Sequence, residues 1–326
     1  MRAVVTGGAG FIGSHLIENL VASGADVVCV ERRGASRQWI GSLPITVAEC
    51  GVSDPDALAP FLEGVDVVFH LAGLTEARTP ADYYAVNTDG TSVVLKAAAR
   101  KGSRAPRVIL MSSIAAVGPA PNGELIGPDT IPRPLSAYGQ SKLRAEAVVH
   151  AYRDRVPATI VRFPSVYGPR ERGVLKFFQL VRRGVALTIG GWDRQLNLIY
   201  VADVVAGLRR LADAPAAAGR TYCLAHPEVV TWRGFAAEVG RALKREPMLV
   251  SVPRSIARVV ARCAEVGAAI RRRAAILNRE RVEEITQERW LCDVSRASAE
   301  VGFAPAFPTA RGIPETAAWY QEHGWL

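Results

Sequence analysis

The sequence predicts an α/β protein built on a doubly wound parallel sheet, with a smaller, mostly helical substrate domain in its C-terminal part. Three observations predict this class. Short, continuous apolar runs alternate with helix-like segments through the first half of the chain. A glycine-rich loop joins the first apolar run to the first helical segment, and turns and longer helices dominate after Arg162. Strands without polar alternation are typical of a parallel sheet that helices cover on both faces.

The predicted elements follow one another in a regular order. Helical spacing of apolar residues predicts helices, and short β-rich runs predict strands. The first half is predicted to contain strands at 3–6, 27–30, 65–70, 108–111 and 156–163, with helices at 14–23 and 87–101. The later part is predicted to contain helices at 174–183, 231–243 and 253–273, and a strand at 196–201 that enters a helix at Asp203. We therefore expect a cofactor-binding domain over residues 1–165, to which 198–224 return, and a substrate-binding region over 166–326.

Composition excludes several other classes. The chain has 326 residues, of which 49% are hydrophobic and 22% charged, as in ordinary globular proteins. No apolar run approaches the ~18 residues of a membrane span. Because the first residues already have the pattern of a strand, we expect no signal peptide. The five cysteines are widely spaced. We interpret them as reduced thiols, and expect a cytoplasmic protein without a metal site.

The chain carries a net charge of +9, and its 40 basic residues comprise 35 Arg and five Lys. Because the arginines are scattered, we interpret them as solvated surface charges and expect no nucleic-acid partner. One exception is the predicted helix 253–273, which carries an apolar stripe beside a row of arginines. We expect this stripe to pack on its own domain or to form a lid, and membrane contact to be unlikely.

The glycine-rich loop predicts a dinucleotide site. Gly7, Gly10 and Gly13 follow a G-x-x-G-x-x-G pattern between a strand and a helix. Glycines there allow a tight turn and close approach of a pyrophosphate to the helix N-terminus. Glu31 ends the second strand, where a carboxylate accepts hydrogen bonds from the ribose of NAD. Arg32 follows at once and could pair with a 2′-phosphate, so NADP stays possible.

A second set of residues predicts proton transfer. Ser113 ends a strand of the parallel sheet, where such sheets bind ligands. Tyr138 and Lys142 are four residues apart, so a helix places both on one face. A free tyrosine has a pKa of ~10, and we expect the Lys142 cation to lower that pKa. Together these groups suit proton exchange with a hydroxyl or carbonyl while a hydride moves to or from nicotinamide.

These motifs resemble the extended short-chain dehydrogenase/reductase superfamily. The resemblance includes Asn87-x-x-Gly90-Thr91, the run from Arg162 to Pro169, and Tyr200 to Val204, and it spans nearly the whole chain. It implies a Rossmann domain, bound NAD or NADP, a Ser-Tyr-Lys mechanism and a homodimer. The cofactor-binding residues that it implies are Gly7, Gly10, Phe11, Ile12, Gly13, Glu31, Arg32, Leu71, Ala72, Gly73, Asn87, Ser112, Tyr138, Lys142 and Phe163.

Departures from the family patterns reduce the number of reactions that the enzyme is expected to catalyse. Ile114-Ala115 follows Ser113 where 4,6-dehydratases have Asp-Glu, and Ser165 stands where sugar-nucleotide enzymes commonly have Asn. The resemblance is nearest to the 3β-hydroxysteroid dehydrogenase-like branch. We therefore favour an enzyme that interconverts a secondary alcohol and a ketone on a cyclic or hydrophobic molecule, with a sugar-nucleotide epimerase as the alternative. The substrate residues implied are Ser165, Tyr167, Arg170, Arg194 and Asn197.

A non-catalytic nucleotide-sensing module is a third and less favoured reading. The net charge of +9 permits it. The presence of Ser113, Tyr138 and Lys142 together argues against it, because a module that only binds a nucleotide has no need of a proton-transfer set.

Overall fold

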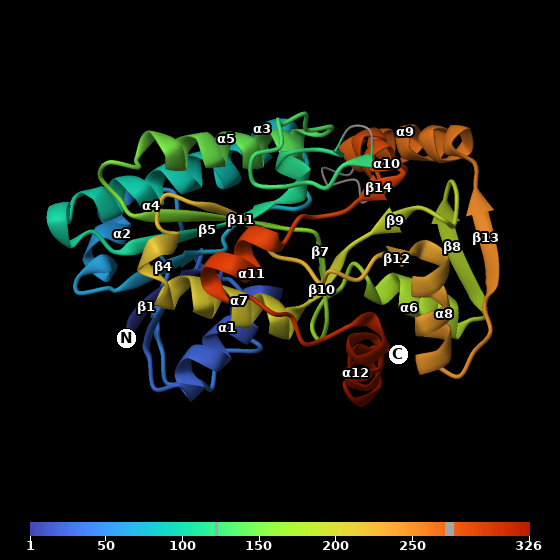
Figure 1. The fold of residues 1–326 in the computed structure, drawn as a ribbon, viewed down its shortest axis with the longest axis horizontal. Helices are drawn as coiled ribbons and strands as arrows, with labels where there is room; N and C mark the ends of the chain where they lie inside the picture. Colours follow the sequence, from blue (N-terminus) through green and yellow to red (C-terminus); the bar gives the residue numbers. More distant parts are fainter. Residues whose placement is uncertain (121–122, 271–276) are drawn as a thin grey trace.

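The computed structural model describes residues 1–120, 123–270 and 277–326. Its centre is a sheet of seven strands in the order β11-β6-β5-β4-β1-β2-β3 (Figure 1). All neighbouring strands in this sheet run parallel. The strands are β1 (Arg2–Thr6), β2 (Asp26–Val30), β3 (Thr46–Ala48), β4 (Val67–His70), β5 (Arg107–Ser113), β6 (Ala158–Phe163) and β11 (Thr221–Cys223). The predicted α/β class with a doubly wound parallel sheet is confirmed.

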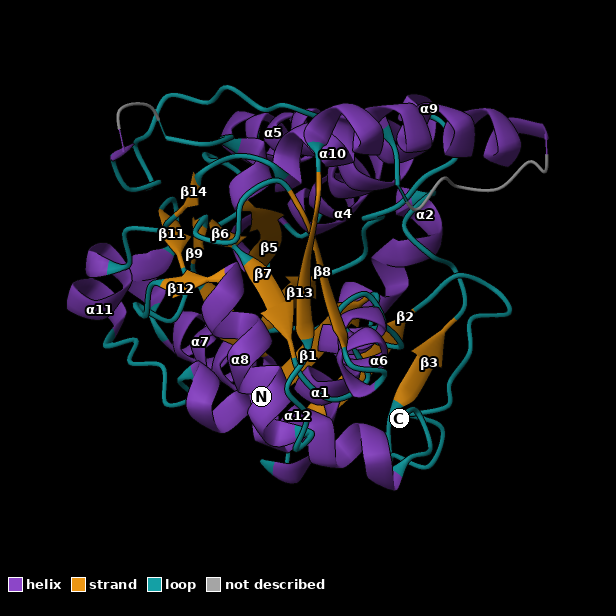
Figure 2. Cartoon of the chain, turned by 90° about the vertical axis from the view of Figure 1, so that its right-hand side faces the viewer, coloured by secondary structure: helices purple, strands orange, loops and turns teal. Residues whose placement is uncertain are grey.

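Helices cover both faces of the sheet, as Figure 2 shows. Val5 of β1 packs into one apolar cluster with α1 (Phe11–Ala22) and α7 (Val201–Asp213), while the adjacent Val4 packs into another with α4 (Gly90–Ala99) and α5 (Ala137–Ala151). Side chains on both faces of the sheet are therefore buried, which explains why the strand sequences are continuously apolar. One layer comprises α1, α7 and α11 (Ser295–Val301), and the other comprises α2 (Pro55–Leu58), α3 (Pro80–Tyr83), α4 and α5.

The rest of the chain forms a second region of small sheets and helices. Its core is aromatic and includes Tyr167, Phe178, Phe235 and Tyr320. The strands pair as β7 (Ser165–Tyr167) with β10 (Leu198–Tyr200), β9 (Gln195–Leu196) with β12 (Val230–Thr231) and β14 (Arg289–Trp290), and β8 (Val185–Ile189) with β13 (Met248–Val252). The helices are α6 (Leu175–Arg182), α8 (Trp232–Ala242), α9 (Arg254–Ile270), α10 (Arg279–Ile285) and α12 (Thr309–Glu322). After β10, α7 packs on the large sheet and β11 joins it.

Helix α9 corrects one expectation. The stripe of large apolar residues does not pack on the protein: Val259 and Val266 are 64% and 57% exposed. The buried face is made of small residues instead, with Ala257 and Ala261 packed against Val282. The last residues of the predicted helix, 271–273, lie outside the described part of the chain.

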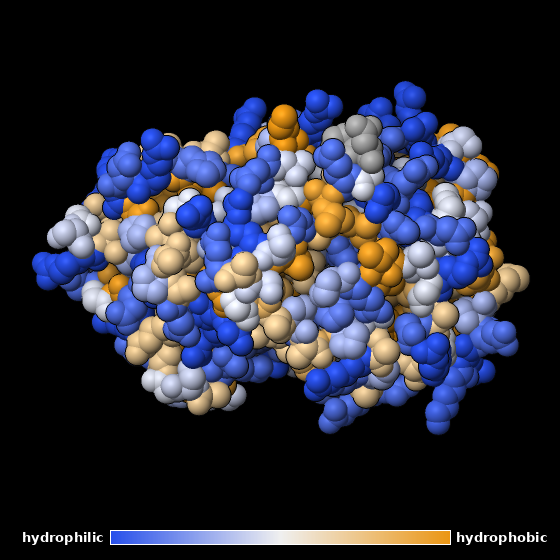
Figure 3. All heavy atoms as spheres, viewed as in Figure 1, coloured by the Kyte–Doolittle hydropathy of each residue, from blue (hydrophilic) through white to orange (hydrophobic). Residues whose placement is uncertain are grey.

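Elsewhere the surface is mixed, and Figure 3 shows hydrophilic side chains spread over most of the visible face. Seventeen ion pairs link arginines, one lysine and two histidines to carboxylates within the described ranges, most of them at the surface. Many of the basic residues are therefore balanced locally, which fits their interpretation as surface charges. Among the described residues, no helix is both long and apolar enough to cross a membrane.

Candidate active site

The glycine loop between β1 and α1 forms a close-packed cradle. Gly7 has a φ of 70°, a conformation that favours glycine. A Cβ at Gly7 would lie 2.8 Å from the Cα of Ala72, and a Cβ at Gly13 would lie 2.3 Å from the carbonyl oxygen of Gly7. Gly10 is exposed, and the first turn of α1 begins directly after it with Phe11 and Ile12. The first amides of a helix lack partners within the helix, so this loop fits the pyrophosphate of a dinucleotide.

Glu31 lies against this loop. It follows β2, and its Oε1 accepts a hydrogen bond of 2.6 Å from the backbone amide of Ala9. Burial raises the pKa of Glu31, and the Ala9 amide partly offsets that effect. The carboxylate is thus held beside the glycine cradle, where the ribose of the cofactor was predicted to bind. Arg32 and Arg33 are exposed.

The segment after β4 forms a wall between the cradle and helix α5. The amide of Ala72 donates to Thr6 Oγ1 over 3.2 Å, which ties the segment to β1. At Gly73, a Cβ would lie 3.1 Å from Asn87 Oδ1 and 3.1 Å from Lys142 Nζ. The structure therefore brings Gly7, Ala72, Gly73, Asn87 and Lys142 together, as the sequence analysis expected. Leu71 extends the same wall, and its amide donates to the Thr6 carbonyl oxygen.

Asn87 has a bonding role that the motif alone did not reveal. It lies in a π-helical turn, Tyr84–Asp89, just before α4. Its Oδ1 accepts from the Leu74 amide over 2.8 Å, and its Nδ2 donates to Leu74 O and to Ser141 Oγ. The side chain thus fastens the wall to helix α5 one residue before Lys142.

Ser113 and Tyr138 meet at the end of β5. Ser113 is the last residue of that strand, and Tyr138 lies in the first turn of α5. The Ser113 side chain lies close enough to Tyr138 to affect its pKa, and the Tyr138 ring packs 5.9 Å from the ring of Tyr83. Helix α5 begins here because the Ser136 hydroxyl caps it, accepting from the Gly139 amide. The two hydroxyls that the sequence analysis assigned to one proton-transfer site therefore lie close together.

The expected lowering of the Tyr138 pKa is wrong. Burial raises the pKa of Tyr138, and the nearby Ser113 side chain only partly offsets this. Lys142 lies on the same face of α5, but its Nζ donates to the carbonyl oxygen of Met111 over 2.9 Å. Burial lowers the pKa of Lys142 itself to about 8. Burial of both groups outweighs the pairwise effect that the sequence suggested.

A buried ion pair behind the site was not foreseen. Glu146, one turn beyond Lys142, accepts two hydrogen bonds from Arg162 of β6, at 3.0 and 2.8 Å. The same carboxylate accepts from Ser112 Oγ over 2.6 Å. The hydroxyl of Ser112 is therefore engaged away from the predicted cofactor site, and Phe163 at the end of β6 is 2% exposed within the core. This network fastens α5 to β5 and β6.

Helix α10 covers the start of α5. Glu280 Oε2 accepts from the Ala137 amide over 2.8 Å, and Glu284 accepts a short hydrogen bond from Ser136. Carboxylates at the N-terminus of a helix are stabilised by its dipole. Burial raises the pKa of Glu284, whose charge in turn raises that of Tyr138. The spacing of these acids along the sequence gave no sign of this contact, which is made by residues far apart in the chain.

The predicted substrate arginines are engaged inside the protein. Arg170 donates to Ser14 Oγ and to Glu18 on α1, and packs over the Trp39 ring. Arg194 is 7% exposed and donates to the carbonyl oxygens of Gly191 and Ile285. These contacts do not support the predicted binding of a phosphate or carboxylate by either side chain.

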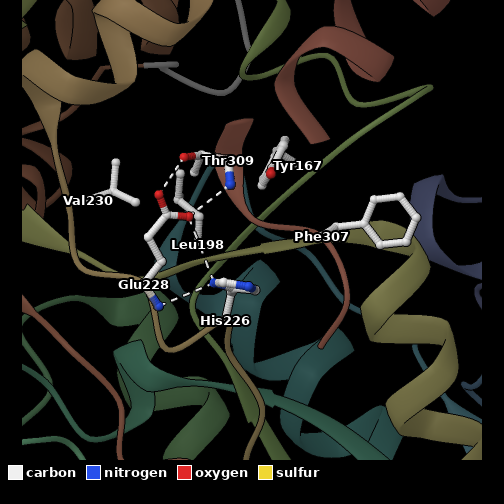
Figure 4. A pocket seen from close by; sticks show the side chains of 7 residues that line it. All are labelled: Tyr167, Leu198, His226, Glu228, Val230, Phe307 and Thr309. Carbon is white, nitrogen blue, oxygen red and sulfur yellow. Dashed lines mark hydrogen bonds and ion pairs between the residues drawn. The ribbon is translucent and has the colours of Figure 1, made fainter. Parts of the chain in front are cut away.

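Asn197 and Tyr167 are also committed to packing. Asn197 donates to Glu228 O and accepts from the Cys292 amide. Tyr167 is 1% exposed, and Figure 4 shows it among the side chains around Glu228, where Thr309 donates to the carboxylate. Both residues therefore stabilise the second region. Ser165 is the one predicted substrate residue of this group whose side chain is exposed.

In the described ranges, no group of histidines, cysteines and carboxylates has the geometry of a metal site. The five cysteines are free, and Cys29, Cys223 and Cys292 are buried.

The arrangement defines a nucleotide-binding α/β enzyme with a serine, tyrosine and lysine at the end of its central sheet. The model of the NAD dependent epimerase/dehydratase family matches residues 3–225, and the chain belongs to this family, within the extended short-chain dehydrogenases/reductases. NAD is the cofactor of the family, and the glycine cradle fits it. The predicted family, cofactor and enzyme class are confirmed.

Individual relatives differ in activity. The chain is 27% identical over 322 residues to a ceramide reductase of Caulobacter vibrioides (strain NA1000 / CB15N), covering 99% of this chain and 95% of that protein. It is 30% identical over 248 residues to an uncharacterized UDP-glucose epimerase of Bacillus subtilis (strain 168), covering 68% of this chain and 75% of that protein. The crystal structure of UDP-glucuronic acid 4-epimerase from Bacillus cereus in complex with NAD shares the fold, with a TM-score of 0.80, 20% identity and 99% coverage of both chains. The family therefore includes both reductases and epimerases.

Proposed function

We propose that this enzyme interconverts a secondary alcohol and a ketone on a hydrophobic molecule that carries no diphosphate, with NAD as its redox partner. The observation that carries the proposal is the engagement of the two candidate arginines. Arg170 is paired with Glu18, and Arg194 donates to backbone oxygens. Neither side chain is free to neutralise a sugar-nucleotide diphosphate. The similarity to a ceramide reductase over nearly the whole of both chains supports the same class of substrate.

The cofactor would be held by the glycine loop at one end of the site and by residues near Tyr138 at the other. The amides of the loop Gly7–Gly13 would bind the pyrophosphate, and Glu31 the adenine ribose. Lys142 and Asn87 lie beside Gly73, on the side of the wall nearer Tyr138. The bound nicotinamide supplies or accepts a hydride. The residues of this chain supply the proton and hold the substrate oxygen.

In the direction of reduction, Tyr138 acts as the proton donor. Because burial raises its pKa, the phenol stays protonated at neutral pH. Tyr138 and Ser113 both donate hydrogen bonds to the carbonyl oxygen of the substrate, which polarises and positions the carbonyl group. As the carbonyl carbon gains a hydride, its oxygen takes the proton from Tyr138, and the product is a secondary alcohol. General acid catalysis of this kind contributes about 10²–10⁴-fold to the rate.

A second candidate is epimerisation of a sugar nucleotide. The observation that favours it is the 30% identity to an uncharacterized UDP-glucose epimerase. In that reaction Tyr138 would take a proton from a substrate hydroxyl and later return it, and the ketone would stay bound between the two steps. The same residues serve both reactions, so the substrate-binding residues decide between them.

The two candidates predict different results in one assay. Purified protein would be mixed with NADH and either a long-chain aliphatic ketone or a sterol ketone, and in a separate reaction with NAD⁺ and UDP-glucose. The proposal predicts that nicotinamide absorbance falls with one of the hydrophobic ketones, and that UDP-glucose is recovered unchanged. Conversion of UDP-glucose to its 4-epimer without net reduction of NAD⁺ would contradict it. Tyr138→Phe serves as the control for contaminating activity.

A further inference from the structure

Helix α9 presents its large apolar side chains to solvent. Ile256, Val259, Val260 and Val266 recur at helical spacing and are 53%, 64%, 50% and 57% exposed. The opposite face, with Ala257 and Ala261, is buried. A helix that only covered its own domain would have the reverse arrangement, because burying large apolar side chains is what stabilises packing.

Arginines flank this apolar face on one side. Arg254, Arg258 and Arg262 are spaced four residues apart, so they form a row beside it. Arg258 is paired with Glu283, and Arg254 donates to the Thr286 carbonyl oxygen. Arg262 is exposed. An apolar face bordered by a basic row is typical of helices that lie in a membrane interface.

Two more exposed apolar residues extend the same side of the molecule. Ile131 and Leu135, on the loop before α5, are 74% and 37% exposed. Ser136 follows at once and contacts Glu284 of α10, which packs against α9. Figures 1 and 2 show α5, α9 and α10 along one side, and Figure 3 shows hydrophobic atoms at that edge. We call Ile131, Leu135, Ile256, Val259, Val260 and Val266 the α9 face.

We propose that the α9 face docks on an anionic lipid bilayer, with α9 lying parallel to its surface. The apolar residues would enter the boundary between headgroups and acyl chains, and the exposed Arg262 and the net charge of +9 would meet lipid phosphates. A second copy of this chain is a poorer occupant, because both copies would carry the same net charge of +9 and repel each other. The proposal reverses the expectation of no membrane contact and holds whichever substrate the enzyme takes.

Vesicle flotation with the full chain tests this proposal. Wild-type protein is expected to float with phosphatidylcholine vesicles that contain phosphatidylglycerol, and not with phosphatidylcholine alone. Val259→Ser together with Val260→Ser should weaken partitioning by about tenfold or more, because two buried aliphatic groups are lost. Arg262→Gln should weaken it by roughly fivefold at low salt. Val229→Ser is the matched control, since Val229 is 51% exposed on the loop before β12.

Three results would overturn the proposal. They are failure of the wild type to float with anionic vesicles, equal flotation of the double variant, and equal loss in the Val229→Ser control. Light scattering adds an independent readout: a wild-type oligomer that the double variant dissociates, without vesicle binding by either, would make the α9 face an interface between copies. Thermal unfolding midpoints should match among all variants, because every replaced side chain is at least half exposed or a surface arginine.

Discussion

The ion pair behind the catalytic helix provides a sharp test of how α5 is held. The side chains of Glu146 and Arg162 are 2% and 6% exposed, and two hydrogen bonds join them. Glu146→Leu would leave the guanidinium buried, with only the Gly127 and Pro128 carbonyl oxygens as acceptors. Removing one partner of a buried pair costs about 3–5 kcal/mol. Ser112 would also lose its acceptor.

A double variant distinguishes the effect of leaving one buried charge without its partner from the effect of removing the whole ion pair. Glu146→Leu with Arg162→Met replaces the charges by apolar groups of similar volume, and such replacements are often neutral or stabilising. Urea unfolding is therefore expected to show a free energy of unfolding lowered by about 3–5 kcal/mol in the single variant and largely recovered in the double variant. A single variant that loses less than about 1 kcal/mol, or a double variant as unstable as the single one, would refute this reasoning.

Three further predictions concern the cofactor cradle, the lysine and the arginine on α1. Gly10→Ala adds a Cβ that would lie 3.2 Å from Gly7 O, so this variant should keep its unfolding midpoint but bind NAD about tenfold more weakly. Gly13→Ala should lower both the unfolding midpoint and the NAD affinity. Equal NAD affinity of the wild type and the two variants, measured by calorimetry, would contradict this. Burial lowers the pKa of Lys142 from 10.5 to about 8, so between these values only the unfolded chain holds the proton, and stability rises with pH. Relative to Lys142→Met, the wild type should gain on the order of 3 kcal/mol between pH 7 and pH 10.5 in urea unfolding, and a constant difference would argue against a buried ammonium. Arg170→Gln should lower stability by about 1 kcal/mol through loss of its pairing with Glu18 and leave the KM for substrate unchanged; a large rise in KM would show that Arg170 does bind substrate.

The residues proposed for cofactor binding and proton transfer come from local patterns. The glycine loop depends on a few neighbouring residues, and the spacing of Tyr138 and Lys142 depends only on helix geometry. Such features can be recognised because they depend only on residues that are close together in the sequence. The fold class was predicted equally well, because continuous apolar runs require a parallel sheet covered on both faces.

Long-range contacts and burial explain what could not be predicted. The bonds of Arg170 to α1 and of Arg194 to Ile285 join segments far apart in the chain. No local pattern distinguishes an arginine that is free to bind a ligand from one engaged in this way. The pKa of Tyr138 was misjudged because a pairwise rule ignores desolvation, which burial under α10 makes dominant. On α9, the period of the stripe was right, but periodicity does not say which face is buried.

The central claim is that Tyr138 exchanges the proton in an alcohol–ketone conversion. The most direct test compares wild type with Tyr138→Phe in single-turnover oxidation of NADH by a long-chain ketone, with NADH binding followed by fluorescence. The account predicts that the variant binds NADH as the wild type does and loses about 10²–10⁴-fold in rate. Retained turnover in the variant would contradict the mechanism.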